Sequence, residues 1–301
     1  MRYKLSAPAT LHTTIQLPAS KSISNRALIL HALAQGHIAP SNLSDCDDTR
    51  VMIKALDGNP GHIDILAAGT AMRFLTAYLS VTPGTRIITG TERMQQRPIR
   101  ILVDALRELG AQIEYAGKEG FPPLRITGTE LTGEEISLAG NVSSQYISAL
   151  LMIGPILKNG LRLNLTGEII SRPYINLTLQ LMKEFGADAA WSSESSITVR
   201  PGKYRDIPFT VESDWSGASY WYQMVALIQD NEKKESTKTE IKLPGLLPRS
   251  YQGDSRGAEI FAKLGVHTTY TDQGVILTKM GTPVTCLKED LVDIPDLAQT
   301  F

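Results

Sequence analysis

Residues 98–115 read PIRILVDALRELGAQIEY and combine a helical pattern of apolar residues with a short alternating segment. Apolar residues recur every three or four positions up to Leu109, and Gly110 follows them. This is typical of an amphipathic helix that a glycine terminates. After Gly110, polar and apolar residues alternate, which indicates a β-strand. The segment therefore predicts a helix that is followed directly by a strand.

The same pattern of helix, glycine and strand occurs twice more in the chain. Residues 173–191 follow it around Gly186, and residues 256–270 follow it around Gly265, so the three glycines are 76 and 79 residues apart. A period of this length indicates a supersecondary unit that is repeated along the chain.

A second kind of helix lies within these periods and begins in small or hydroxyl-bearing residues. The examples are GTAMRFL at 69–75, SSQYISAL at 143–150 and DWSGASYW at 214–221. Because strands and helices alternate throughout, we predict an α/β protein that is built from repeated βαβαββ units. A doubly wound sheet would not repeat in this way.

Residues 17–28, LPASKSISNRAL, predict an anion-binding site at the start of a helix. Ser20 or Ser22 can cap this helix, and Lys21 and Arg26 add positive charge where the backbone N–H groups are unpaired. A phosphorylated or carboxylated small molecule fits such a site. The alternative interpretation is an ordinary capped helix with solvated basic residues.

The composition excludes several classes of protein. The 30 basic and 31 acidic residues nearly cancel, which argues against a surface for nucleic acid or anionic membranes that relies on bulk charge. The chain has no apolar run of about 18 residues and no signal-peptide pattern, so we expect a cytoplasmic protein that does not enter the membrane. Cys46 and Cys286 lie far apart in no metal-ligand spacing, and we expect neither a metal nor a cofactor.

Two stretches depart from the repeat. Between 48–56 and the turn at 67–69 the chain has only a short link and one strand, so one repeat is abridged. Residues 292–301, VDIPDLAQTF, begin a helix that would have about one turn, whereas isolated helices need roughly 12–15 residues. We therefore expect the chain to be truncated at its C-terminus.

Six short motifs occur in order along the chain. They are KSISNR at 21–26, GTAMR at 69–73, RPI at 97–99, VSSQ at 142–145, SRPY at 171–174 and IPD at 294–296. Each motif is weak alone, but together they resemble the 3-phosphoshikimate 1-carboxyvinyltransferase (EPSP synthase) family over the whole chain. The resemblance implies transfer of the enolpyruvyl group of phosphoenolpyruvate to the 5-hydroxyl of shikimate 3-phosphate. The products are 5-enolpyruvylshikimate 3-phosphate and phosphate, in the shikimate pathway that leads to chorismate and the aromatic amino acids.

The resemblance also implies which residues bind the two small-molecule substrates. Those for shikimate 3-phosphate are Lys21, Ser22, Arg26, Ser143, Ser144, Gln145, Ser171, Tyr174 and Asp296. Those for phosphoenolpyruvate are Lys21, Gly69 and Arg97, with support from Thr70 and Arg73. Asp296 and Lys21 are the implied catalytic residues. Asp296 would accept the proton of the 5-hydroxyl as that oxygen attacks C2 of phosphoenolpyruvate, and Lys21 would reach between the substrates.

The architecture that the resemblance implies is a two-domain α/β fold of βαβαββ units, an inside-out α/β barrel with helices inside and sheets outward. Residues 17–208 would form the continuous domain on the shikimate 3-phosphate side. Residues 1–16 and 209–301 would form a discontinuous domain on the phosphoenolpyruvate side, incomplete at the C-terminus. We expect a monomer, and its activity by itself stays an open question, because the family's later phosphoenolpyruvate-binding segment follows the point where this chain ends.

Two alternatives stay open. The related transferase that acts on UDP-N-acetylglucosamine shares the fold, but it places a cysteine where residues 91–97, TERMQQR, have none. The hydroxyl pair Ser143 and Ser144 also favours a phosphate ligand. From a different class, the chain could be a non-catalytic module that binds shikimate 3-phosphate. The missing segment favours a module, whereas Asp296 and Arg97 favour descent from an active enzyme.

Overall fold

The computed structural model describes residues 4, 11–58, 60–228 and 239–301. The chain divides into two compact units, which we call the split unit and the continuous unit. The split unit comprises Met1–Ser20 with Glu212–Phe301, and the continuous unit comprises Lys21–Val211. The domain limits expected from the resemblance, 1–16 with 209–301 and 17–208, stay a prediction.

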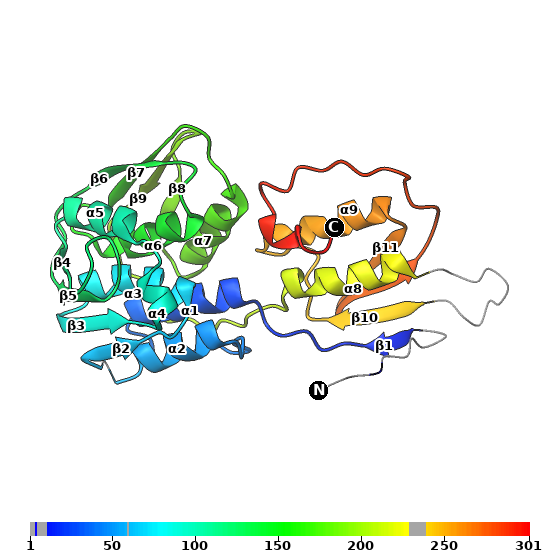
Figure 1. Ribbon diagram of the computed structural model, residues 1–301, viewed down its shortest axis with the longest axis horizontal. Helices are drawn as coiled ribbons and strands as arrows, with labels where there is room; N and C mark the ends of the chain where they lie inside the picture. Colours follow the sequence, from blue (N-terminus) through cyan, green and yellow to red (C-terminus); the bar gives the residue numbers. More distant parts are fainter. Residues whose placement is uncertain (1–3, 5–10, 59, 229–238) are drawn as a thin grey trace. The chain divides into compact units, whose positions relative to one another are not determined.

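The continuous unit contains two four-stranded sheets of the same topology (Figure 1). The first has the order β2-β3-β5-β4, with β2 (His62–Asp64), β3 (Gly84–Thr89), β4 (Gln112–Tyr115) and β5 (Leu124–Gly128). The second has the order β6-β7-β9-β8, with β6 (Glu135–Ala139), β7 (Leu161–Thr166), β8 (Ala189–Trp191) and β9 (Ser196–Val199). In each sheet the first two strands are parallel and the other neighbours are antiparallel.

A helix connects the two parallel strands of each sheet, because parallel neighbours cannot be joined by a tight turn. These helices are α3 (Gly69–Val81) and α6 (Ser144–Ile153). A further helix, α5 (Arg100–Glu108) or α7 (Arg172–Glu184), leads to the antiparallel pair. Both repeats therefore have the predicted βαβαββ order. The connections also contain the short helix α4 (Glu92–Gln95) and the 3-10 helix η1 (Gly154–Ile156).

The split unit has the same topology, with its first strand supplied from the N-terminal part of the chain. Its sheet has the order β1-β10-β12-β11, in which β1 (His12–Thr14) is parallel to β10 (Glu240–Pro244). The other elements are α8 (Trp215–Leu227), η3 (Gly253–Arg256), α9 (Gly257–Lys263), β11 (Val266–Thr271), β12 (Gly274–Lys279) and η4 (Pro295–Leu297). Within the described ranges the three sheets stay separate and do not close into a barrel.

The three glycines that the sequence places at helix ends have the backbone conformation that this position requires. Gly110, Gly186 and Gly265 have φ angles of 104°, 88° and 79°. This left-handed region is costly for residues with a Cβ atom, and glycine enters it freely. Each glycine lets the chain turn from a helix into the strand that follows, namely β4, β8 and β11.

Two helices of the continuous unit precede its first sheet. These are α1 (Lys21–Leu33) and α2 (Asp47–Leu56), and β2 is the only described strand between α2 and α3. This agrees with the abridged repeat that the sequence predicts. Every residue of α1 from Ile23 to Leu30 is buried, because α1 contacts α2, α3, α6 and α7. Across the described ranges, no helix has both the length and the apolar character that crossing a membrane demands.

Candidate functional site

The first predicted anion site lies at the start of α1. Lys21 is the first residue of this helix and is exposed, and Ser22 is half-buried. One turn further, Arg26 is only 3% exposed. Its Nη1 donates a hydrogen bond to the carbonyl oxygen of Ser22 at 2.9 Å, and its guanidinium group lies over the ring of Phe74, 5.2 Å from the centroid. Arg26 therefore stabilises the first turn of α1 by a hydrogen bond from the buried side of the helix.

The remaining partners of Arg26 are neutral hydroxyl groups. Its Nε donates to Oγ1 of Thr178 at 2.7 Å, and its Nη2 donates to Oγ of Ser148 at 3.0 Å. No ion pair of Arg26 is found among the described residues. Burial lowers the pKa of Arg26 to about 10, so the guanidinium group is still charged at neutral pH. A buried cation with neutral partners favours an anion nearby.

The start of α6 supplies a second group of predicted site residues. Ser143 caps the helix, because its Oγ accepts a hydrogen bond from the backbone N–H of Gln145 at 3.4 Å. Ser144 is half-buried at the first helical position. Nε2 of Gln145 donates to Oγ1 of Thr70 at 3.2 Å, which joins the start of α6 to the start of α3.

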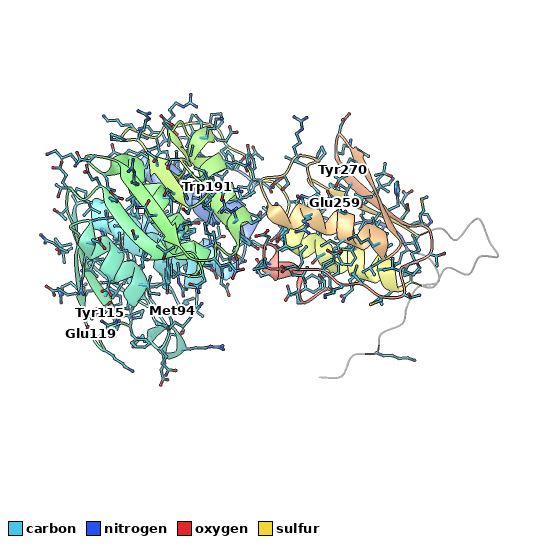
Figure 2. All side chains as sticks on the ribbon, turned by 90° about the horizontal axis from the view of Figure 1, so that it is seen from above. Met94, Tyr115, Glu119, Trp191, Glu259 and Tyr270 are labelled. Atoms are coloured by element: carbon cyan, nitrogen blue, oxygen red, sulfur yellow. The ribbon has the colours of Figure 1, made fainter. Side chains whose placement is uncertain are left out.

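The start of α7 supplies the third group. Ser171 precedes this helix in a left-handed conformation, with φ at 54°, and its side chain forms no capping hydrogen bond. The next residue, Arg172, is held by an aromatic ring, because its guanidinium carbon lies 4.3 Å from the ring centroid of Trp191. Trp191 is labelled in Figure 2. Pro173 follows at a position where its missing N–H is no loss, and Tyr174 is half-buried.

These three helix starts belong to one packed cluster. The helices α1, α6 and α7 contact one another, and Figure 1 shows them together in the continuous unit. Free backbone N–H groups and the helix dipole make each helix start suitable for an anion. The structure therefore brings most of the residues predicted for shikimate 3-phosphate into the same cluster of helices.

A second cluster surrounds Gly69, the first residue of α3. A Cβ atom at Gly69 would lie 2.6 Å from Nη1 of Arg73 and 2.6 Å from Nη1 of Arg97. Arg73 donates from Nη1 to the carbonyl oxygen of Gly69 at 2.8 Å, and its guanidinium group lies over the ring of Tyr146. Two guanidinium groups thus meet at a position where only glycine leaves room for them.

The charge of Asp48 raises the pKa of Arg73 in this second cluster, but no carboxylate pairs with its guanidinium groups among the described residues. Neither Arg73 nor Arg97 forms an ion pair with another described residue. Nε of Arg73 is buried without a hydrogen-bond partner. Burial lowers the pKa of Arg73, and the nearby charge of Arg97 also lowers it. The arrangement favours a small anion that would relieve this repulsion.

Arg93 is a further arginine of this region that none of the six sequence motifs includes. A cavity of about 490 Å³ is lined by Ala67, Arg93, Met94 and Arg97. Arg93 and Met94 belong to the short helix α4, and Met94 is labelled in Figure 2. Arg93 precedes Arg97 by four residues, but α4 ends at Gln95, so it is the shared cavity that places the two cations in one wall.

Asp296 is the one predicted site residue of the split unit. It lies exposed in the 3-10 turn η4, whose buried neighbours Ile294 and Leu297 pack with Ile260 of α9. A Cβ atom at Gly257 would lie 2.8 Å from Cδ1 of Leu297, so α9 and η4 approach each other closely. This apolar anchor holds the turn that carries Asp296.

The fold and these clusters define an α/β protein of βαβαββ repeats whose helix starts are suited to anions. The family model described as EPSP synthase (3-phosphoshikimate 1-carboxyvinyltransferase) matches residues 5–58 and 59–301. The chain belongs to this family. The two matched segments meet between α2 and β2.

Curated relatives agree with the family model. A 3-phosphoshikimate 1-carboxyvinyltransferase of Bacteroides fragilis is 71% identical over 301 residues, which are 100% of this chain and 72% of the relative. One of Shewanella pealeana is 38% identical over 316 residues, covering 96% of this chain and 72% of the relative. The second alignment is longer than the chain itself, so that relative has residues that this chain lacks.

A solved structure shows the same fold. EPSP synthase from Acinetobacter baumannii has a TM-score of 0.73 and 20% sequence identity to this chain. The comparison covers 91% of this chain and 65% of the solved chain, so this chain spans slightly less than two thirds of that structure.

Proposed function

We propose that this chain catalyses the transfer of an enolpyruvyl group from phosphoenolpyruvate to the 5-hydroxyl of shikimate 3-phosphate. The products are 5-enolpyruvylshikimate 3-phosphate and phosphate. Membership of the family supports this proposal, and so does the chemistry of the two clusters, since both substrates are polyanions and both clusters offer cations and N–H donors. The proposed reaction needs no cofactor.

Shikimate 3-phosphate would bind at the starts of α1, α6 and α7. The 3-phosphate would accept hydrogen bonds from the hydroxyl groups of Ser143, Ser144 and Ser171. The residues proposed for the carboxylate, the hydroxyl groups and the ring are Lys21, Ser22, Arg26, Gln145 and Tyr174. All of them belong to the continuous unit.

Phosphoenolpyruvate would bind beside Gly69, between the guanidinium groups of Arg73 and Arg97. Its carboxylate and phosphate are suited to two close cations, because a planar guanidinium group can donate two parallel hydrogen bonds to either group. Thr70 would support this wall through the hydrogen bond that its Oγ1 accepts from Nε2 of Gln145. Lys21 would reach between the two substrates.

In the proposed chemistry, Asp296 accepts the proton of the 5-hydroxyl while that oxygen forms a bond to C2 of phosphoenolpyruvate. A proton from water adds to the methylene carbon and makes C2 electron-poor, and Lys21 stabilises the surrounding negative charge. The tetrahedral intermediate then loses phosphate, which takes up the proton held by Asp296. The former methylene carbon returns one proton to water, and this restores the double bond.

The observation that carries this proposal is the convergence of Arg73 and Arg97 on Gly69 in a chain of this family. A surface arginine is ordinarily solvated or paired with a carboxylate. Here, two guanidinium groups lie together at a helix start, and one of them has a buried Nε without a partner. Such an arrangement is costly unless an anion binds to it.

The decisive experiment measures phosphate release from phosphoenolpyruvate by the purified chain, together with calorimetric binding of shikimate 3-phosphate. We expect shikimate 3-phosphate to bind and phosphate release to require both substrates. Binding without release from a folded sample would identify a non-catalytic module. Release that depends on UDP-N-acetylglucosamine instead would identify the related transferase, and no binding at all would refute the proposal.

We also propose that the chain acts as a cytoplasmic monomer on these small molecules, without nucleic acid or membrane. The near balance of 30 basic and 31 acidic residues supports the absence of a polyanionic partner. Size-exclusion chromatography with light scattering tests this part, and a stable dimer at micromolar concentration would contradict it.

A further inference from the structure

A ring of hydrogen bonds lies beneath the three helix starts. Arg26 donates from Nε to Thr178 and from Nη2 to Ser148, and the hydroxyl oxygens of Ser148 and Thr178 are 2.8 Å apart. Thr178 uses its single proton for the carbonyl oxygen of Tyr174 at 2.9 Å. Ser148 must therefore donate to Thr178, which leaves every hydroxyl proton of this ring with an acceptor. We call Arg26, Ser148 and Thr178 the buried network.

The buried network lies one helical turn further along each helix than a half-buried residue proposed to bind shikimate 3-phosphate, and its Arg26 is itself proposed to bind this ligand. Each member follows a residue proposed to bind shikimate 3-phosphate by four positions, which is about one turn of a helix. The pairs are Ser22 with Arg26, Ser144 with Ser148, and Tyr174 with Thr178. The first residue of each pair is half-buried. The second is buried, with an exposed fraction of 3% for Arg26, 0% for Ser148 and 0% for Thr178.

The buried network joins three helices that are distant in the sequence. Arg26 is separated from Ser148 by 122 residues and from Thr178 by 152 residues. Two members of the network also donate hydrogen bonds to the backbone one helical turn earlier. Arg26 donates to the carbonyl oxygen of Ser22, and Thr178 donates to that of Tyr174. The network therefore couples the side chain of Arg26 to the first turns of α1 and α7.

We propose that Ser148 and Thr178 are positioning residues of the shikimate 3-phosphate site, which orient Arg26 and hold α6 against the first turns of α1 and α7. This inference rests on the proposed function. The structure assigns hydrogen bonds to three of the five guanidinium N–H groups of Arg26. One N–H group remains on each of the terminal nitrogens Nη1 and Nη2. The hydroxyl groups of Ser148 and Thr178 fix the plane of the guanidinium group, and therefore the direction of these two N–H groups.

A cluster with a merely structural role would need no cation. Hydroxyl groups and apolar side chains can join three helices, whereas a buried arginine without a carboxylate costs stability. The positive charge is therefore explained by a ligand rather than by folding. A precise orientation of this charge matters because hydrogen bonds to a bound anion depend steeply on direction.

The test compares binding of shikimate 3-phosphate by the full chain and by three network variants, with calorimetry for Kd and circular dichroism for the fold. Thr178→Val keeps the shape and removes the hydroxyl, Thr178→Ser keeps the hydroxyl, and Ser148→Ala removes the second partner. We expect Kd to rise about tenfold in Thr178→Val and Ser148→Ala, and to stay near the wild-type value in Thr178→Ser.

The chain offers matched controls on α3. Thr76 and Ser80 are fully buried, and each hydroxyl donates to a backbone carbonyl four residues earlier, as Thr178 does. Neither belongs to the buried network. Thr76→Val and Ser80→Ala should therefore lower the melting temperature to a similar extent and leave Kd for shikimate 3-phosphate unchanged.

A spectroscopic readout separates orientation of Arg26 from general loosening. In protein with ¹⁵N-labelled arginine, the Nε–H of Arg26 should exchange slowly in the wild type and in Thr178→Ser, and rapidly in Thr178→Val.

If the wild type binds shikimate 3-phosphate and the folded Thr178→Val and Ser148→Ala variants bind it equally well, the positioning role is refuted. The same holds if Thr178→Ser loses as much affinity as Thr178→Val. If the folded wild type binds none, the proposed function fails as well.

Discussion

At the scale of single residues, the structure shows why particular side chains are required. Gly69 leaves room for two guanidinium groups that any Cβ atom would displace. Glu212 is a buried carboxyl group, 7% exposed, whose Oε1 accepts hydrogen bonds from Ser250, Tyr251 and Gln252 while its Oε2 has no partner. Substitution of Gly69 should change ligand binding, and substitution of Glu212 should change how the stability of the chain depends on pH.

Gly69→Ala should weaken the binding of phosphoenolpyruvate by about tenfold or more, because its Cβ atom would push Arg73 and Arg97 from their positions. Binding of shikimate 3-phosphate should change little. Calorimetric titration with each ligand measures both effects. Gly61→Ala is the matched control, because a Cβ atom there meets no atom within 4 Å. Equal losses in the two variants would contradict this account of Gly69.

Glu212 should make the stability of the chain fall as the pH rises. Burial raises the pKa of Glu212 above its ordinary value of 4.5, so the folded state binds the proton more tightly than the unfolded state. This stabilising contribution is complete below pH 4.5 and is lost as the pH rises through the higher pKa of the folded state.

Urea unfolding at several pH values tests this prediction. Glu212→Gln, which keeps an acceptor oxygen and cannot ionise, should remove that part of the pH dependence. Glu108→Gln, at an exposed position of α5, should leave it intact. An unchanged pH profile in Glu212→Gln would refute the role of this carboxyl group.

At the scale of elements, each βαβαββ repeat depends on a glycine that ends its second helix. Gly186 has φ at 88°, and a Cβ atom there would also lie 2.5 Å from Nε of Arg205. Gly167 has a similar φ of 71°, but a Cβ atom there would meet nothing within 4 Å. An alanine at position 167 would add backbone strain alone, whereas an alanine at position 186 would add the same strain together with a steric clash.

Gly167→Ala should lower the free energy of unfolding by about 1–2 kcal/mol, which is the cost of a left-handed conformation for a residue with a Cβ atom. Gly186→Ala should lower it by more, because the clash with Arg205 adds to the same strain. Denaturant unfolding of both variants gives the comparison. Equal losses would mean that Arg205 moves aside without cost.

At the scale of the whole molecule, the chain passes between the split and continuous units only at 20–21 and 211–212. Each unit has its own apolar core. In the split unit, Phe261 is buried with Trp215 and Tyr222, and its ring stacks on Phe301 with centroids 4.4 Å apart. In the continuous unit, Phe74 of α3 is fully buried beneath Arg26. Two separate cores predict two separable unfolding events.

Calorimetric melting should therefore show two transitions. Phe261→Ala should destabilise one of them by about 3–5 kcal/mol, and Phe74→Ala should destabilise the other by a similar amount. Shikimate 3-phosphate should raise only the transition that Phe74→Ala lowers, since its proposed binding residues other than Asp296 lie in the continuous unit. A single transition that both variants lower equally would contradict this view.

The sequence motifs include most residues of the candidate site, but not the buried residues Ser148 and Thr178 that contact Arg26. The strings around Lys21, Gly69 and Ser143 are local, so they could be read directly, and the structure places them at helix starts as expected. Arg93 belongs to none of the motifs, and it is the cavity shared with Arg97 that links the two residues. No local pattern indicates that Arg26 is buried, because its partners Ser148 and Thr178 come from helices more than a hundred residues away.

The amino-acid sequence alone was enough to establish the order of strands and helices, the helix-ending glycines and the family, because these depend on local backbone preferences and on short motifs. Only the tertiary structure revealed that β1 pairs with β10 and that Arg26, Ser148 and Thr178 form one buried network. Such partners are distant in the sequence and meet only when burial of apolar surface brings their elements together.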